Sequence, residues 1–188
     1  MKLVILHIRY FQMQRNQWQL QITPFLLLKL RLLLMNKSAW ALYVTLRDTG
    51  ARVSEVSGLR IKDCDLVAKC LHISPTPWRG LKTTNSQRSV PLSAEAAAAL
   101  AKLARDKDPE APLFPNYAKD RGADSCSAML MKRLRRSIAD RKLTMHSLRH
   151  RMKDKLRNTG CPEAISMAIL GHSTNTVAAN YGSGYALE

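Results

Sequence analysis

Apolar residues return at helical spacing in successive segments from residue 38 onward, and this periodicity limits the fold more than any other feature. In the first segment they are Ala39, Leu42, Tyr43 and Leu46, followed by a helix stop signal at Thr49-Gly50. The same reasoning predicts helices over residues 51–59, 94–105, 125–139, 145–158 and 163–170. The chain is therefore expected to be mainly α.

Residues 64–93 have a different pattern. Leu71-His72-Ile73-Ser74 alternates between apolar and polar residues, and Ser89-Val90-Pro91-Leu92 is a second short run with apolar residues. Turn signals at Gly80 and Asn85-Ser86 separate the two runs and place Lys82 near a hairpin tip. We expect a small antiparallel sheet in an otherwise helical (α+β) domain.

Residues 1–37 form an N-terminal segment that we leave unassigned, and residues 38–188 form the domain. The leucine-rich run Phe25–Met35 is interrupted by Lys29 and Arg31, and it is shorter than the ~20 residues that cross a bilayer. A helix lying on a membrane surface remains an alternative, but a core or docking helix fits better. We expect no membrane partner.

The charge balance points to a polyanionic partner. Thirty Lys and Arg against fourteen Asp and Glu give a net charge of +16 and a pI near 10.2. Nucleic acid is the favoured polyanionic partner, and an anionic membrane is the second candidate. Part of this charge lies on the predicted helix 125–139, whose Lys132, Arg133, Arg135 and Arg136 form either a solvated face or a phosphate-binding one.

The cysteines and histidines give no sign of a metal centre. Cys64, Cys70, Cys126 and Cys161 lack the paired spacing of zinc ligands or of a small disulfide framework, so we interpret them as reduced thiols. We expect the histidines to lack a helical His-x-x-x-His pattern. They are not surrounded by carboxylates, and no Walker phosphate loop is present. We therefore expect no metal and no other cofactor.

Near the C-terminus, several residues suited to phosphodiester chemistry occur close together. His146 and Arg149 are three residues apart and share a helix face. His172 lies in a Gly171-His172-Ser173 turn, and Tyr181 follows nine residues later. Guanidinium groups offer paired donors to phosphate oxygens, and a tyrosine with a pKa of ~10 needs cations and a base to act as a nucleophile.

Arg52 and Glu55 repeat the three-residue spacing earlier in the chain. They are either an exposed ion pair of little energetic value or an arginine directed inward and held by its carboxylate. Their place between two apolar helices favours the second interpretation.

Taken in order, these residues resemble the signature boxes of the tyrosine recombinases, the phage-integrase family. The boxes are Thr49–Glu55, Lys82-Thr83 with Arg88–Leu92, His146–His150, Leu170–Ser173 and Tyr181. The resemblance covers about residues 38–188. It implies a mostly helical catalytic domain with a small three-stranded antiparallel sheet, which closes on duplex DNA as half of a clamp.

The resemblance also implies a role for each matching residue. Arg52 and Arg149 would clamp the non-bridging oxygens of the scissile phosphate, and His172 would hydrogen-bond to it. Lys82 would protonate the leaving 5′ oxygen, and His146 would act as base or proton shuttle. Tyr181 would be the nucleophile that forms a 3′-phosphotyrosine, in preference to Tyr185.

Other residues are expected to support this site or to contact DNA. Glu55 would be the supporting acid, and His150 a structural neighbour. The expected DNA contacts are Arg79, Thr83, Arg88, Arg133 and Arg136.

The expected function is site-specific recombination of double-stranded DNA by an integrase-like enzyme of a mobile element. It would act as a homo-oligomer, a tetramer in synapsis, with accessory DNA-bending proteins, in the cytoplasm and at the nucleoid. Residues 1–37 do not resemble the separate helical DNA-binding domain that usually precedes the catalytic domain in this family. The alternatives are a non-catalytic or truncated DNA-binding remnant and type IB topoisomerase-like strand relaxation.

Overall fold

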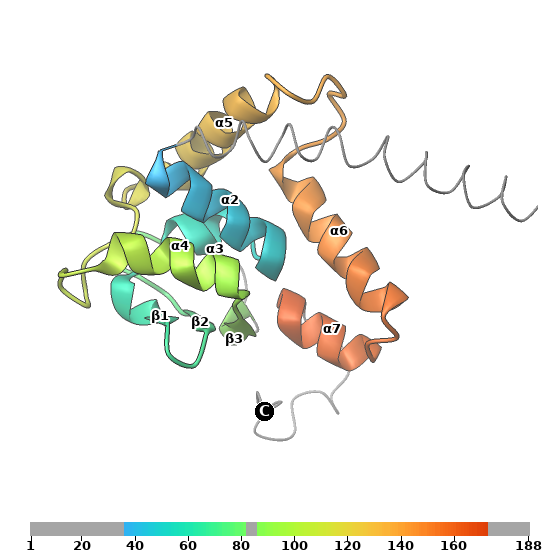
Figure 1. The fold of residues 1–188 in the computed structure, drawn as a ribbon, viewed down its shortest axis with the longest axis horizontal. Helices are drawn as coiled ribbons and strands as arrows, with labels where there is room; N and C mark the ends of the chain where they lie inside the picture. Colours follow the sequence, from blue (N-terminus) through green and yellow to red (C-terminus); the bar gives the residue numbers. More distant parts are fainter. Residues whose placement is uncertain (1–35, 82–85, 173–188) are drawn as a thin grey trace, which may run out of the picture. The chain divides into compact units, whose positions relative to one another are not determined.

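The computed structural model describes residues 36–81 and 86–172, in which six α-helices accompany one three-stranded sheet (Figure 1). The α-helices are α2 (Lys37–Thr49), α3 (Val53–Ser57), α4 (Ala94–Ala104), α5 (Gly122–Leu134), α6 (Met145–Asn158) and α7 (Glu163–Leu170). The strands are β1 (Cys64–Asp65), β2 (Cys70–Ile73) and β3 (Arg88–Pro91). Two short 3-10 helices are η1 (Ile61–Asp63) and η3 (Pro115–Tyr117). The expected mainly α fold with a small antiparallel sheet is confirmed.

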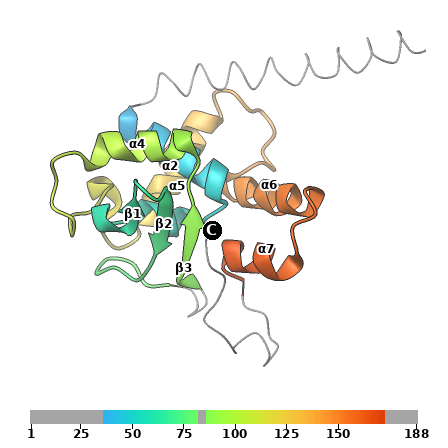
Figure 2. The same cartoon turned by 60° about the horizontal axis from the view of Figure 1, so that its bottom comes forward.

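The sheet has the order β1-β2-β3, and both pairings are antiparallel (Figure 2). Leu71 pairs with Val90, and both side chains are buried, whereas the next pair, His72 and Ser89, is exposed and joined by a 2.9 Å hydrogen bond. This alternation is the pattern that the sequence predicts, with each strand beginning and ending one residue earlier than expected. The hairpin tip with Lys82 lies outside the described residues.

Helix α2 is the centre of the hydrophobic core. Ala39, Leu42 and Leu46 are almost completely buried, and the helix packs against α4 and α6. Helix α4 begins where the sequence predicts, because the Ser93 hydroxyl accepts a hydrogen bond from the Ala96 amide and caps its first turn. The helical spacing of apolar residues in this segment therefore predicted these core residues correctly.

Helix α5 differs from its predicted range of residues 125–139, because it begins at Gly122 and ends at Leu134. The early end follows from Arg135, whose guanidinium donates hydrogen bonds to the carbonyls of Asp140, Arg141 and Leu143. These bonds hold the chain in a loop where the sequence pattern alone continues the helix. Arg135 thus stabilises the connection between α5 and α6.

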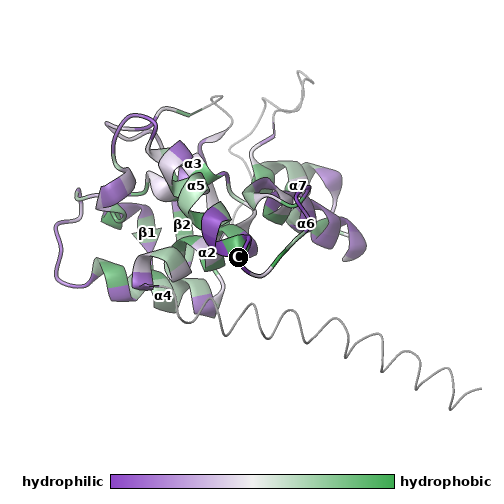
Figure 3. Ribbon diagram, turned by 90° about the horizontal axis from the view of Figure 1, so that it is seen from above, coloured by the Kyte–Doolittle hydropathy of each residue, from purple (hydrophilic) through white to green (hydrophobic). Residues whose placement is uncertain are grey.

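Helix α6 is mostly hydrophilic along its length (Figure 3). Met145 and Arg149 are its buried residues, and the helix contacts α2 and α7. The predicted bounds of α6 and α7 are confirmed. A buried arginine on a helix with so little apolar surface indicates that this part of the core is built around a charge.

The four cysteines are free, and Cys64, Cys70 and Cys126 are buried. Burial raises the pKa of Cys64 and Cys126 to about 12, so both remain protonated thiols at neutral pH.

Within residues 36–81 and 86–172, no helix is long and apolar enough to cross a membrane.

Candidate active site

The start of α3 fixes Arg52 and Glu55 against each other. The Arg52 backbone amide donates to Glu55 Oε2 at 2.7 Å, and Arg52 Nη1 donates to Glu55 Oε1 at 2.7 Å. The side chain of Glu55 is only 3% exposed, whereas that of Arg52 is 23% exposed. This burial excludes the exposed-pair interpretation and supports an arginine held by its carboxylate.

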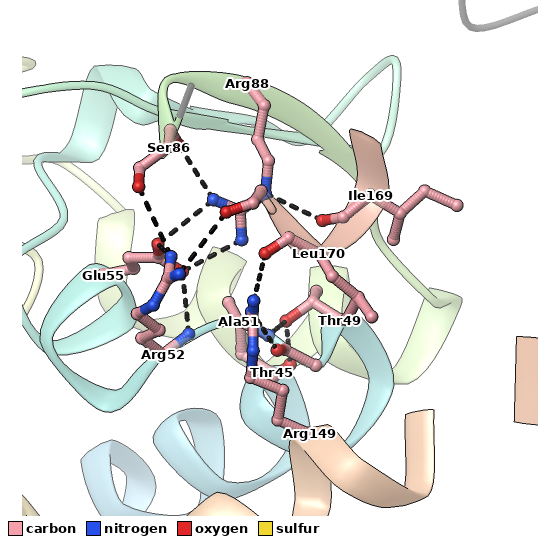
Figure 4. A network of polar contacts seen from close by, with 12 residues as sticks. Thr45, Thr49, Ala51, Arg52, Glu55, Ser86, Arg88, Arg149, Ile169 and Leu170 are labelled. Carbon is pink, nitrogen blue, oxygen red and sulfur yellow. Dashed lines mark hydrogen bonds and ion pairs between the residues drawn. The ribbon is translucent and has the colours of Figure 1, made fainter. Parts of the chain in front are cut away.

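Arg88, at the start of β3, is the second cation on the same carboxylate (Figure 4). Its Nη1 donates to Glu55 Oε1 at 3.1 Å and its Nη2 to Glu55 Oε2 at 2.9 Å. Its Nε donates to the Ile169 carbonyl at 2.7 Å, and Nη1 also donates to the Ser86 carbonyl at 2.8 Å. With its side chain only 7% exposed, Arg88 does not fit the expected role of a DNA contact.

Burial of the Glu55 carboxylate by itself would raise its pKa, but hydrogen bonds and charge from Arg88 and hydrogen bonds from Arg52 outweigh this. The net pKa is lower than usual, so Glu55 is a carboxylate at neutral pH. It can therefore accept hydrogen bonds from both arginines but cannot donate a proton.

Arg149 enters the site from α6. Its Nη1 donates to the Gly50 carbonyl at 3.0 Å, and its Nη2 donates to the Leu170 carbonyl. The residue is 5% exposed, and burial together with the charge of Arg52 lowers its pKa to about 10. It remains a cation at neutral pH and joins the ends of α2 and α7.

The turn between α2 and α3 positions the Gly50 carbonyl. Thr49 Oγ1 donates to the Thr45 carbonyl at 2.6 Å and accepts from the Ala51 amide at 3.2 Å. Gly50 has φ +65°, a left-handed conformation that glycine adopts without strain. The Gly50 carbonyl is thereby directed at Arg149.

The histidines lie beside these arginines. His146, on the exposed face of α6, has a pKa lowered by partial burial, by His150, and by the charges of Arg149 and Arg52. Burial and the charges of Arg149 and Arg52 likewise lower the pKa of His172. Both imidazoles are therefore neutral at pH 7 and able to accept or relay a proton.

His146 and His150 also form an edge-to-face pair, with ring centroids 4.8 Å apart. Their four-residue spacing is a helical His-x-x-x-His pattern, so the expectation that the histidines lack this pattern was wrong. Within the described part of the chain, no group of three metal-ligating side chains could hold a metal ion. Contact with the His150 ring can therefore help to hold the His146 ring in its orientation.

The described site thus carries more positive than negative charge. Arg52, Arg88 and Arg149 surround the single carboxylate of Glu55. One cation is neutralised and a net positive charge remains, which suits a phosphate diester and the further negative charge of its transition state.

Of the remaining predicted residues, some lie outside the described part of the chain and two lie near the end of α5. Lys82, Thr83, Tyr181 and Tyr185 lie outside the described residues. Arg133 is partly exposed near the end of α5, and Arg136 is exposed just beyond it.

Arg79 is buried, contrary to its expected role as a DNA contact. It is 9% exposed, and its Nη2 donates to the Ser74 carbonyl at 2.5 Å. Its side chain packs over Gly58, where an added Cβ would lie 2.8 Å from Arg79 Nε. Burial lowers the pKa of Arg79. The structure therefore places this arginine in the interior of the domain.

Sequence reasoning missed the backbone acceptors of the site. The carbonyls of Gly50, Ser86, Ile169 and Leu170 hold the two buried arginines, and a carbonyl carries no signature in the side-chain pattern. The helix stop signals at Gly50 and Gly171 were the available clue, because carbonyls at helix ends lack partners within the helix.

We expect the free energy of unfolding to fall as the pH is lowered from about 7.5 to about 5.5. The pKa values of His146 and His172 are lowered from 6.5, so the unfolded chain takes up these protons first. Their contribution is complete above pH 6.5 and is lost as the pH falls through the folded-state pKa values. Urea unfolding at both pH values measures the change. The His146→Asn/His172→Asn double variant should depend less on pH in this interval, and an unchanged dependence would contradict the prediction.

The sequence profile described as the phage integrase family matches residues 34–186. The chain belongs to the phage integrase family. The match includes every element described here and the five signature boxes, so the family assignment suggested by those boxes is confirmed.

Known members of the phage integrase family are similar to part of this chain. A tyrosine recombinase XerD of Corynebacterium glutamicum is 32% identical over an alignment of 151 residues, and the match covers 75% of this chain and 46% of that protein. A tyrosine recombinase XerC of Pelobacter propionicus is 26% identical over 145 residues, with the same coverage of 75% and 46%. The chain thus spans about half the length of these relatives.

Solved structures with the same fold include two recombination proteins. The Tn1549 transposon integrase, in complex with a circular intermediate DNA, has a TM-score of 0.59 and 23% identity, covering 81% of this chain and 56% of that one. The XerA recombinase has a TM-score of 0.58 and 24% identity, covering 79% and 54%. At this level of identity the comparison establishes the fold.

Proposed function

We propose that this chain cuts and rejoins DNA strands as a site-specific recombinase, through a 3′-phosphotyrosine intermediate. The observation that carries the proposal is the convergence of Arg52, at the start of α3, and Arg149, on α6, at the end of α7, where His172 follows. Arg149 Nη2 donates to the Leu170 carbonyl, and Arg52 Nη2 lies 3.4 Å from the Gly171 carbonyl, so both guanidinium groups lie beside the turn that leads into His172. Such a set suits one phosphate group.

The proposed roles follow from the chemistry of each side chain. Arg52 and Arg149 bind the non-bridging oxygens, and they stabilise the charge that develops there in the transition state. His172 donates a hydrogen bond to the phosphate, and neutral His146 accepts or relays the proton of the nucleophile.

Tyr181 is the proposed nucleophile, and Lys82 the proposed acid that protonates the leaving 5′ oxygen. Attack by the Tyr181 oxygen forms a phosphotyrosine bond as the phosphorus–O5′ bond breaks. The free 5′ hydroxyl of the same or another strand then reverses the step. The energy of the broken bond is conserved in the intermediate, so resealing requires no nucleotide cofactor.

The assembly is part of the same proposal. Residues 38–188 are the catalytic domain, and residues 1–37 are a separate segment without an assigned role. The partner is double-stranded DNA, and the net charge of +16 fits that partner. The Tn1549 transposon integrase, which has the same fold, is in complex with a circular intermediate DNA. The chain acts at the nucleoid as a homo-oligomer, a tetramer in synapsis, with accessory DNA-bending proteins.

Replacing Tyr181 by phenylalanine is expected to abolish covalent attachment to DNA, because phenylalanine has no oxygen nucleophile. The substrate is a nicked duplex from which the cleaved end diffuses away, so that the covalent intermediate accumulates. The measurement is the fraction of protein that migrates with DNA under denaturing conditions. Tyr185→Phe is the matched control and should form the adduct at the wild-type rate.

Each other outcome points to a different function. An adduct that forms in Tyr181→Phe but not in Tyr185→Phe would identify Tyr185 as the nucleophile. Salt-sensitive DNA binding by the wild type without any adduct would indicate a DNA-binding remnant. Adduct formation at any sequence, with relaxation of supercoiled plasmid, would indicate topoisomerase-like activity.

A further inference from the structure

One carboxylate, that of Glu55, serves two arginines of unequal exposure. Arg88 is 7% exposed and donates to both carboxylate oxygens. Arg52 is 23% exposed and uses one guanidinium nitrogen, Nη1, on the same carboxylate. Arg88 therefore makes a bidentate ion pair with Glu55, whereas the Arg52 side chain is held through a single guanidinium nitrogen.

This division determines what Arg52 can offer to a ligand. Among the described residues, its Nη2 makes only a long contact of 3.4 Å, to the Gly171 carbonyl. Without the Arg88 cation, the full charge of Glu55 would face Arg52 alone. A bidentate ion pair between the Arg52 guanidinium and the Glu55 carboxylate would then become favourable. A guanidinium engaged in that way has fewer donors for a phosphate.

Arg88 also ties the end of α7 to β3. Its Nε donates to the Ile169 carbonyl at 2.7 Å, two residues before Gly171. Gly171 lies so close that an added Cβ would be 2.6 Å from Arg88 Nη1. The path of the chain into His172 is therefore fitted around the Arg88 guanidinium.

We propose that Arg88 is a positioning residue, which neutralises Glu55 and anchors the end of α7 so that Arg52 and His172 are presented to the phosphate. This inference rests on the proposed function. It assigns Arg88 to the interior of the site and removes it from the DNA contacts. A positioning role and a DNA contact make opposite predictions for binding and for chemistry.

The Arg88→Met variant separates the two roles. With a positioning role, its affinity for duplex DNA and the slope of that affinity against salt concentration stay at wild-type values. The single-turnover rate of adduct formation at saturating DNA falls about 10²-fold, the typical effect of misplacing a reacting group by about 1 Å. With a DNA contact, the affinity falls and the salt slope decreases by about one, while the rate at saturating DNA is retained.

Arg60→Met is the matched control. Arg60 repeats the arrangement of Arg52, because its amide donates to Asp63 Oδ2 at 2.8 Å and its Nη2 donates to Asp63 Oδ1 at 3.0 Å. Its side chain is 16% exposed and that of Asp63 is 4% exposed, so the substitution removes a comparable, mostly buried ion pair. Arg60→Met should keep the wild-type cleavage rate, and an equal loss of rate in both variants would mean that Arg88 contributes stability alone.

A readout without DNA tests the same inference. In carboxyl-labelled protein followed by NMR, the pKa of Glu55 should rise in Arg88→Met and stay unchanged in Arg60→Met. An unchanged Glu55 pKa in Arg88→Met overturns the positioning role, whatever the wild type does to DNA. A wild-type chain that forms no adduct overturns the proposed function instead, so the two failures are distinguishable.

Discussion

Replacing Arg149 by methionine is expected to lower the rate of DNA cleavage by about 10²–10³-fold, the usual cost of losing one fixed donor to a developing oxyanion. The free energy of unfolding should change by only about 1 kcal/mol, because two effects oppose each other. The carbonyls of Gly50 and Leu170 lose their donor, which destabilises the fold. The cost of burying a cation beside Arg52 disappears, and that cost is visible in the lowered pKa of Arg149.

Single-turnover cleavage and urea unfolding measure the two quantities separately. Arg157→Met provides a control on the same helix, because the Arg157 side chain is 69% exposed and lies near the far end of α6. It should keep the wild-type rate at saturating DNA. An Arg149→Met variant that cleaves DNA normally would remove Arg149 from the proposed site.

Replacing Gly50 by alanine is expected to destabilise the fold by about 3 kcal/mol, the sum of two costs. The φ of +65° is strained for a residue with a side chain. The added Cβ would also lie 2.7 Å from Met152 Cβ and 3.1 Å from Leu170 Cδ2, where α6 and α7 pack. Relief of this overlap must move the Gly50 carbonyl away from Arg149, so the rate of cleavage should fall as well.

Gly160→Ala separates the backbone cost from the packing cost. Gly160 has a similar φ of +72°, but an added Cβ would meet nothing within 4 Å. Its substitution should cost only about 1 kcal/mol, from the backbone conformation alone. Chemical denaturation gives both values, and equal losses in the two variants would show that the space around Gly50 is not limiting.

Local sequence signals predicted the elements that depend on local chemistry. The Ser93 cap places the start of α4, and the alternation around Leu71 and Val90 places the paired strands. The end of α5 could not be predicted, because it depends on three hydrogen bonds from Arg135 to a loop that follows it. In that case a tertiary contact outweighs the helical period.

The same division holds for the arginines of the site. Their spacing and order were enough to identify the family, and the roles of Arg52 and Arg149 stay predictions. The burial of Arg79 and Arg88 could not be predicted, because an arginine has the same letter whether it faces solvent or is enclosed by carbonyl groups. Burial decides between these states, and burial is a property of packing.

The sequence by itself determined the helical periodicity, the short antiparallel strands, the large positive charge and the order of the reactive residue types. These follow from local backbone preferences and from the spacing of side chains along one element. Only the tertiary structure decided which cation neutralises Glu55 and which carbonyls hold Arg149. Those partners lie up to 99 residues apart in the chain, and they meet only when α2, α6, α7 and β3 pack together.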